Sequence, residues 1–176
     1  MSARRVAKYL QVMKKIILVD RSSGRRLARI KGIHSEIKLY IGEKKPGKDG
    51  KITAQNKEGI VLEYLVHGHK GYIHTFMAGD VPYESIPPIA HFSSNTPYDY
   101  LVVSHHGAEM ETRLLTSIAK KDGYAIVCAK KGKKGRLTRS HKKALTNNKY
   151  SVRVTGAARL CIEIDLLNHK APKLCN

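Results

Sequence analysis

Apolar and polar residues alternate in short runs along most of the chain, a pattern typical of β-strands. At the amino end, apolar residues recur at helical spacing (Val6, Leu10, Met13 and Ile17), which predicts an amphipathic helix over residues 3–15. Short β-rich runs follow, and they predict strands over residues 16–20, 25–30 and 36–41. A polar, lysine-rich and glycine-rich stretch over residues 42–50 predicts a loop.

The middle and the end of the chain are more regular. Two β-rich runs, 60–66 and 72–77, flank a glycine turn, which predicts an antiparallel hairpin. Beyond the hairpin the pattern alternates: strands are expected over residues 100–103, 124–129, 151–155 and 160–166, and helices over residues 83–89, 111–120 and 140–147. Ser140 is the expected N-cap of the last helix. This alternation predicts an α/β fold in which helices pack on a sheet.

Composition narrows the class of protein. The 176 residues suffice for one domain, and 33 Lys and Arg against 14 Asp and Glu give a net charge of +19. Such a charge indicates a polyanionic partner, nucleic acid first. No apolar run approaches the roughly 18–20 residues of a membrane helix, and the basic start is followed by too short an apolar run for a secretory signal. We therefore expect a cytoplasmic protein that makes no membrane contact.

Polar residues that suit catalysis follow two of the predicted strands. Asp80 comes after the second hairpin strand through Gly79, and His105 and His106 follow the strand at 100–103, with Gly107 behind them. Open α/β sheets place their sites at such strand ends. A carboxylate with imidazoles suits zinc or manganese. A helix N-cap is the alternative role of Asp80, at about even odds before the histidines are considered.

A basic stretch over residues 130–143 is the candidate phosphate-binding surface. Nine of its fourteen residues are Lys, Arg or His, in a glycine-containing loop that leads into the last predicted helix. His141 stands in the first turn of that helix, where a phosphate would lie. The H-x-H at His67 and His69 is interpreted as turn residues. The expected nucleic-acid contacts are Lys130, Lys131, Lys133, Lys134, Arg136, Arg139, Lys142 and Lys143.

These motifs together resemble the metallo-β-lactamase-fold hydrolases, and within them the branch related to the nuclease domain of ComEC-type competence proteins. The matching runs are Asn56–Leu62, Ala78-Gly79-Asp80, Ser104-His105-His106-Gly107 and Thr138–Leu145. The main metal motif of that family, H-x-H-x-D-H, does not occur in the sequence. The resemblance therefore implies an incomplete αββα sandwich, with a basic helix and strand segment at 1–30 and the carboxyl-terminal half of the domain at 31–176.

The resemblance also implies roles for the candidate residues. Asp80 would bridge two metal ions, Zn²⁺ or Mn²⁺, a histidine of the His105–His106 pair would complete one of them, and His141 would contact the phosphate or the leaving group. A second copy of the chain or a separate chain would supply the missing half. The implied function is a truncated or degenerate phosphodiesterase, weak or inactive in isolation. The alternative is a non-catalytic, basic nucleic-acid-binding protein; a ribosome-associated protein fits the composition alone.

Overall fold

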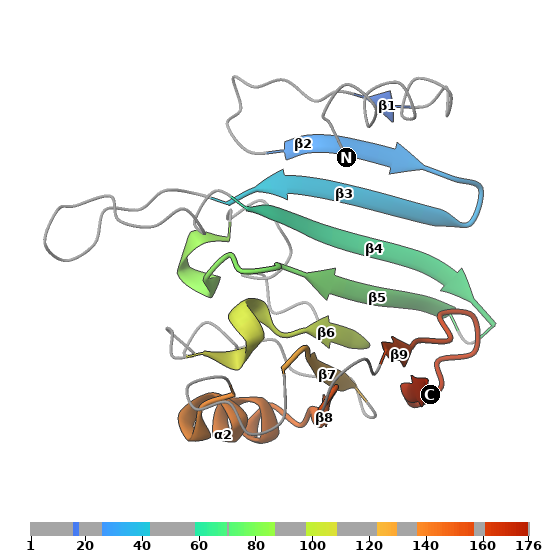
Figure 1. The fold of residues 1–176 in the computed structure, drawn as a ribbon. Coiled ribbons are helices and arrows are strands. Elements are labelled where there is room, and N and C mark those ends of the chain that lie inside the picture. The colour runs from blue at the N-terminus through green and yellow to red at the C-terminus, as the bar shows by residue number, and fades with distance from the viewer. Residues whose placement is uncertain are drawn as a thin grey trace, which may run out of the picture.

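The dominant feature of the protein is one large mixed β-sheet (Figure 1). The computed structural model describes residues 16–17, 26–42, 59–69, 71–86, 98–108, 123–129, 137–156 and 161–175. The sheet has eight strands whose spatial order is their order in the chain. They are β1 (Ile16–Ile17), β2 (Arg26–Lys31), β3 (Ser35–Ile41), β4 (Ile60–Gly68), β5 (Gly71–Met77), β6 (Tyr100–Val102), β7 (Tyr124–Val127) and β8 (Ser151–Val154).

The sheet changes character at β5. Strands β1 to β5 form an antiparallel meander, whereas β5 to β8 are mutually parallel. The predicted hairpin is confirmed, because β4 and β5 pair from Leu62 opposite Met77 to Gly68 opposite Gly71. Because β5 to β8 run parallel, their carboxyl ends all lie at the same end of the sheet. Each parallel neighbour is reached by a crossover connection.

The predicted α/β fold, an αββα sandwich, is wrong. Besides the main sheet, the described residues contain a sheet of only two strands, β9 (Cys161–Glu163) and β10 (Lys173–Cys175), and one α-helix, α2 (Arg139–Asn147). The amino-terminal strands add to the edge of the same sheet instead of building a second layer. A strand periodicity predicts that a strand exists but not which neighbour it pairs with, and this is why the sequence misassigned the layers.

The main core lies on the face of the sheet that carries α2. Phe76, Leu101 and Ala125 stand in one row across β5, β6 and β7, because they are paired in register, and all three are fully buried. Leu145 of α2 packs onto this row. The fully buried Val81, in the connection after β5, completes the cover. Burial of this face is the main favourable contribution to folding.

The carboxyl-terminal segment covers the opposite face. Ile73, Tyr100 and Ile126 are buried there against partly buried side chains of the segment that contains β9. Gly68 permits this approach, since a Cβ atom at that position would lie 2.7 Å from the carbonyl oxygen of Leu167. Within the small sheet, Cys161 stands directly opposite Cys175, although the two are distant in sequence.

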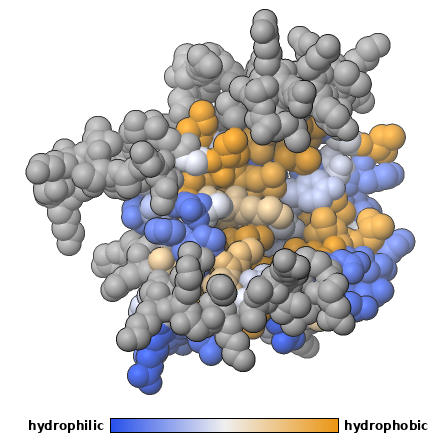
Figure 2. Space-filling view, in the orientation of Figure 1, coloured by the Kyte–Doolittle hydropathy of each residue, from blue (hydrophilic) through white to orange (hydrophobic). Residues whose placement is uncertain are grey.

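Apolar side chains also gather over β3 and β4, as Figure 2 shows. There Leu39 is paired with Leu62 and Ile41 with Ile60. Ile41 and Ile60 are 43% and 58% exposed, so the sheet is covered less completely here than over its parallel strands.

Of the helices predicted from periodicity, the one at 140–147 is confirmed as α2, whereas the one at 83–89 is shorter than expected. The expected helix at 83–89 is represented by a single 3-10 turn, η3 (Tyr83–Ser85), and residues 87–89 lie outside the described residues. The expected helices at 3–15 and 111–120 also lie outside them. Proline residues at 87 and 88 fit the early stop, because proline cannot continue a helical hydrogen-bond ladder.

Candidate functional site

Asp80 and His106 lie together at the edge where the parallel strands end. Asp80 follows β5, and His106 belongs to the 3-10 turn η5 (Ser104–Gly107) that follows β6. Because β5 and β6 are parallel neighbours, their ends are adjacent, and His106 Nε2 lies 3.5 Å from Asp80 Oδ1. The side chains are 36% and 49% exposed, respectively, so a ligand has access to both.

The backbone around these two side chains is unusual. His105 and His106 both adopt left-handed conformations, with φ of 47° and 58°, in a region that residues with a Cβ atom seldom occupy. Two hydrogen bonds hold the turn against the end of β5: His105 N–H donates to Gly79 O over 2.8 Å, and the Ser104 hydroxyl donates to Val81 O. Strained residues of this kind persist where the surrounding structure holds them, and they cluster at functional sites.

A hydrogen bond from the other ring nitrogen, Nδ1, determines the tautomer of His106. Nδ1 of His106 bonds to the carbonyl oxygen of Cys128, which only accepts, so we assign a proton to Nδ1. Nε2 then faces the Asp80 carboxylate. Nε2 and the carboxylate oxygen, 3.5 Å apart, are then two acceptors that face each other, an arrangement that suits a shared cation.

The donor set can be tested against the metal that the sequence suggested. A catalytic zinc site uses three protein ligands and a water. Within the described ranges, no three His, Cys, Asp or Glu side chains come close enough together to hold a metal ion. Asp80 and His106 supply two donors, so the described residues do not fit a zinc or manganese centre by themselves.

The structure places His141 inside the protein rather than at a ligand surface. The residue is 0% exposed, and both ring nitrogens have protein partners: Nδ1 lies 3.1 Å from Ala108 O, and Nε2 lies 3.0 Å from the Tyr83 hydroxyl. A carbonyl only accepts, so Nδ1 carries the proton and Nε2 accepts from Tyr83. Burial lowers the pKa of His141, and hydrogen bonds to the backbone partly offset this. A neutral ring therefore joins α2, η3 and the loop after η5.

The amino end of α2 is attached to the candidate site by its backbone. Thr138 N–H donates to Gly107 O over 2.9 Å, and Gly107 has φ of 76° with Leu137 packed where a Cβ atom would lie. Thr138, not the predicted Ser140, is the N-cap, because its side-chain oxygen accepts from His141 N–H and the helix begins at Arg139. The helix therefore starts directly beside the histidine pair.

Part of the predicted basic surface can be located. Arg139, Lys142 and Lys143 lie on α2 and are exposed. The other expected contacts (Lys130, Lys131, Lys133, Lys134 and Arg136) lie outside the described residues. These three cations therefore lie close in sequence to Thr138, whose backbone is hydrogen-bonded to the turn that carries His105 and His106.

A second carboxylate–imidazole pair, Asp99 and His169, was not predicted from the sequence. Asp99, which precedes β6, is 2% exposed, and its Oδ2 accepts from His74 N–H over 2.7 Å. His169 Nε2 lies 3.2 Å from Asp99 Oδ1, in a contact without the alignment of a good hydrogen bond. No local pattern links Asp99 with His169, since they are far apart in the chain and meet only when the carboxyl-terminal segment docks.

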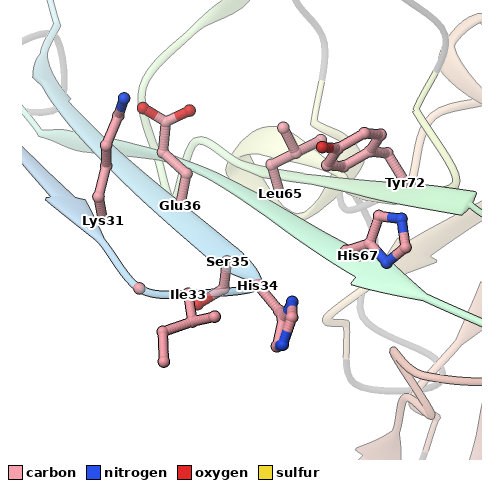
Figure 3. A pocket seen from close by; sticks show the side chains of 9 residues that line it. Lys31, Ile33, His34, Ser35, Glu36, Leu65, His67 and Tyr72 are labelled. Atoms are coloured by element: carbon pink, nitrogen blue, oxygen red, sulfur yellow. The ribbon is translucent and has the colours of Figure 1, made fainter.

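A cavity at the opposite end of β5 was also missed. It measures about 380 Å³ and is lined by residues of the β2–β3 turn and the β4–β5 hairpin. Figure 3 shows His34, His67 and Tyr72 side by side along it. His67 was interpreted as a turn residue, but it belongs to β4, and its ring makes a T-shaped contact with Tyr72 at 5.0 Å between centroids.

Comparison with known proteins adds no family. Neither a model of a known protein family nor a curated protein sequence matches this chain. Of the helices that the structure describes, none is both long and apolar enough to cross a membrane.

Proposed function

We propose that this chain binds nucleic acid through the phosphate backbone, using the cations that α2 presents beside the Asp80–His106 edge. The observation that carries the proposal is the exposure of Arg139, Lys142 and Lys143 on a helix that His141 and Thr138 fix against the histidine turn. Lysine and arginine contacts to phosphates need no base-specific geometry. They suit a chain with a net charge of +19.

Electrostatics favours a partner that is itself densely charged. A protein that neutralises several phosphates releases counterions, and its affinity then falls steeply as salt rises. Fixed positions also favour binding, because cations on a helix that is bonded at its first turn lose less conformational freedom than cations on a free segment. The Asp80 carboxylate lies beside this surface, with His106 Nε2 3.5 Å from it.

The test is a salt series of binding to a fluorescently labelled oligonucleotide, followed by anisotropy. The triple variant R139Q/K142Q/K143Q should bind more weakly at low salt. Its plot of log affinity against log salt should be shallower by about two, since each lost phosphate contact removes roughly 0.7–0.9 from the slope. An unchanged slope would contradict the role of α2.

A matched control removes the same charge elsewhere. The triple variant R153Q/K170Q/K173Q changes three exposed cations that lie on β8 and the carboxyl-terminal segment and not on α2. Its net charge equals that of the helix variant, so a general loss of charge affects both equally. The proposal requires the helix variant to lose distinctly more affinity than this control.

A metal-dependent phosphodiesterase is the second candidate, and one observation favours it. Asp80 and His106 converge at the ends of parallel strands, where α/β proteins place their sites. This function needs at least one more ligand, from residues outside the described ranges or from another chain. Elemental analysis tests it: wild type should carry close to one equivalent of Zn²⁺ or Mn²⁺, and Asp80→Ala should carry none. A metal-free wild type after incubation with either ion would count against it.

A further inference from the structure

The cavity at the far end of β5 combines exposed aromatic rings with positive charge. Lys31, His34, His67 and Tyr72 line it, and all four are exposed, Tyr72 to 62%. In Figure 3 the ring of His67 lies between those of His34 and Tyr72. The volume of about 380 Å³ falls within the range of small-ligand pockets.

Strand pairing places the three rings in a row. His67 stands opposite Tyr72 in the β4–β5 ladder, and His67 N–H donates to His34 O over 2.8 Å. The centroids of His34 and His67 are 6.4 Å apart. Because all three residues sit on paired backbone, the three rings emerge from fixed positions on the same side of the cavity.

The polar groups at the rim define the ligand further. Glu36 is the acidic residue in the lining, and its carboxylate is paired with Arg29. Among the described residues that line the cavity, Lys31 supplies an exposed ammonium group. An exposed aromatic ring beside a cation is an arrangement by which proteins hold an unpaired base and its phosphate.

We infer that this aromatic cavity stacks an unpaired base of a single-stranded nucleic acid, with Lys31 on the adjacent phosphate. The inference rests on the proposed function and adds to it the strand state of the ligand. The cavity and Asp80 lie near opposite ends of β5, which is seven residues long. At about 3.3 Å per residue of β5, a single-stranded nucleic acid bound both in the cavity and at the Asp80 end would extend roughly 20 Å along the sheet.

The test uses single-stranded oligonucleotides and two substitutions at one position. Tyr72→Ala removes the stacking surface, and its affinity should fall by about 5- to 100-fold, as alanine substitutions of stacking aromatics do. Tyr72→Phe keeps the ring and should retain wild-type affinity. Leu167→Ala alters another exposed apolar side chain, outside the cavity, and should change nothing. Tyr72 is mostly exposed, so its loss should leave folding intact, and a circular dichroism melt checks this.

Two further measurements separate stacking from charge. An oligonucleotide of abasic sites keeps its phosphates, so its affinity for wild type should already be reduced, and Tyr72→Ala should reduce it no further. Lys31→Gln should lower the salt slope by about 0.7.

If Tyr72→Ala binds the normal oligonucleotide as wild type does while R139Q/K142Q/K143Q is impaired, the stacking inference is overturned and the proposed function stands. If wild type binds no oligonucleotide at low salt, both are overturned.

Discussion

Two carboxylate–imidazole pairs, at opposite ends of the parallel strands, share their chemistry but differ in their surroundings. Asp80 and His106 lie at the carboxyl ends, with side chains 49% and 36% exposed, whereas Asp99 and His169 lie at the amino end of β6, 4% and 19% exposed. Asp99 also accepts a backbone N–H from β5, at His74. The exposed pair can give up its mutual contact for a ligand, while the buried one holds the carboxyl-terminal segment on the sheet.

Backbone strain does not distinguish the pairs. His106 has φ of 58° and His169 has φ of 49°, so both imidazoles stand on left-handed residues. What distinguishes them is burial. Left-handed histidines thus mark a tightly held turn in this protein, and exposure decides which turn is available to a ligand.

The largest effect should come from removing the buried carboxylate. Asp99→Ala removes the acceptor of the buried His74 N–H and the carboxylate beside the His169 ring, and it should lower the free energy of unfolding by about 3 kcal/mol. Asp80→Ala removes a contact between exposed side chains and should change the free energy of unfolding by less than about 0.5 kcal/mol. Urea denaturation measures both. Equal losses in the two variants would show that the pairs do not differ as their burial indicates.

A smaller effect should appear as a pH dependence of stability. The folded-state pKa of His141 is lowered by burial, so the unfolded chain takes up a proton there that the folded chain does not. The stabilisation by neutral His141 is full above the unfolded pKa of about 6.5 and is lost as pH falls below it, by up to about 1.4 kcal/mol per pH unit.

The control for this pH dependence is a side chain that does not titrate. His141→Gln should be less stable than wild type at pH 7, because its amide replaces the two ring hydrogen bonds imperfectly. Urea denaturation at pH 7, 6 and 5 should give a difference between the two proteins that narrows as pH falls. A constant difference would exclude His141 as the source of the pH dependence.

The smallest effects should come from glycine at the two strained histidines. His106→Gly relieves a left-handed conformation worth about 1 kcal/mol and loses two partly exposed contacts, with Asp80 and with Cys128 O, so its melting temperature should change little. His169→Gly gains the same relief but loses the contact with Asp99 and the packing on Tyr100, so it should melt at a lower temperature. A lower melting temperature for both variants would mean that the His106 turn is as structural as the His169 turn.

Much of the local structure was predictable. The strands at β3, β4, β5, β6 and β7 lie where the periodicity predicts them, within a few residues, because alternation along a strand follows from the backbone itself. The adjacency of Asp80 and His106 could also be foreseen, since each follows a strand and parallel neighbours end at one edge. The N-cap at Thr138 was misassigned by two residues, a usual error for a helix boundary.

The rest depended on long-range packing. His141 looked like a surface residue because its neighbours in the sequence are basic, and only the docking of Tyr83 and Ala108 around it makes it a buried, neutral ring. The aromatic row of His34, His67 and Tyr72 needs the register of three strands, and each residue taken alone is unremarkable.

The amino-acid sequence by itself determined the net charge, the strand positions and the polar residues at the strand ends, because these follow from composition and local periodicity. Tertiary structure decided the large mixed sheet in place of a sandwich, the burial of His141 and Asp99, and the exposure of Asp80 and Tyr72. Burial and hydrogen-bond partners come from segments distant in the chain, and pairing between distant strands is not encoded in any short stretch. For this reason the same two residue types form a structural contact at one end of the sheet and an accessible site at the other.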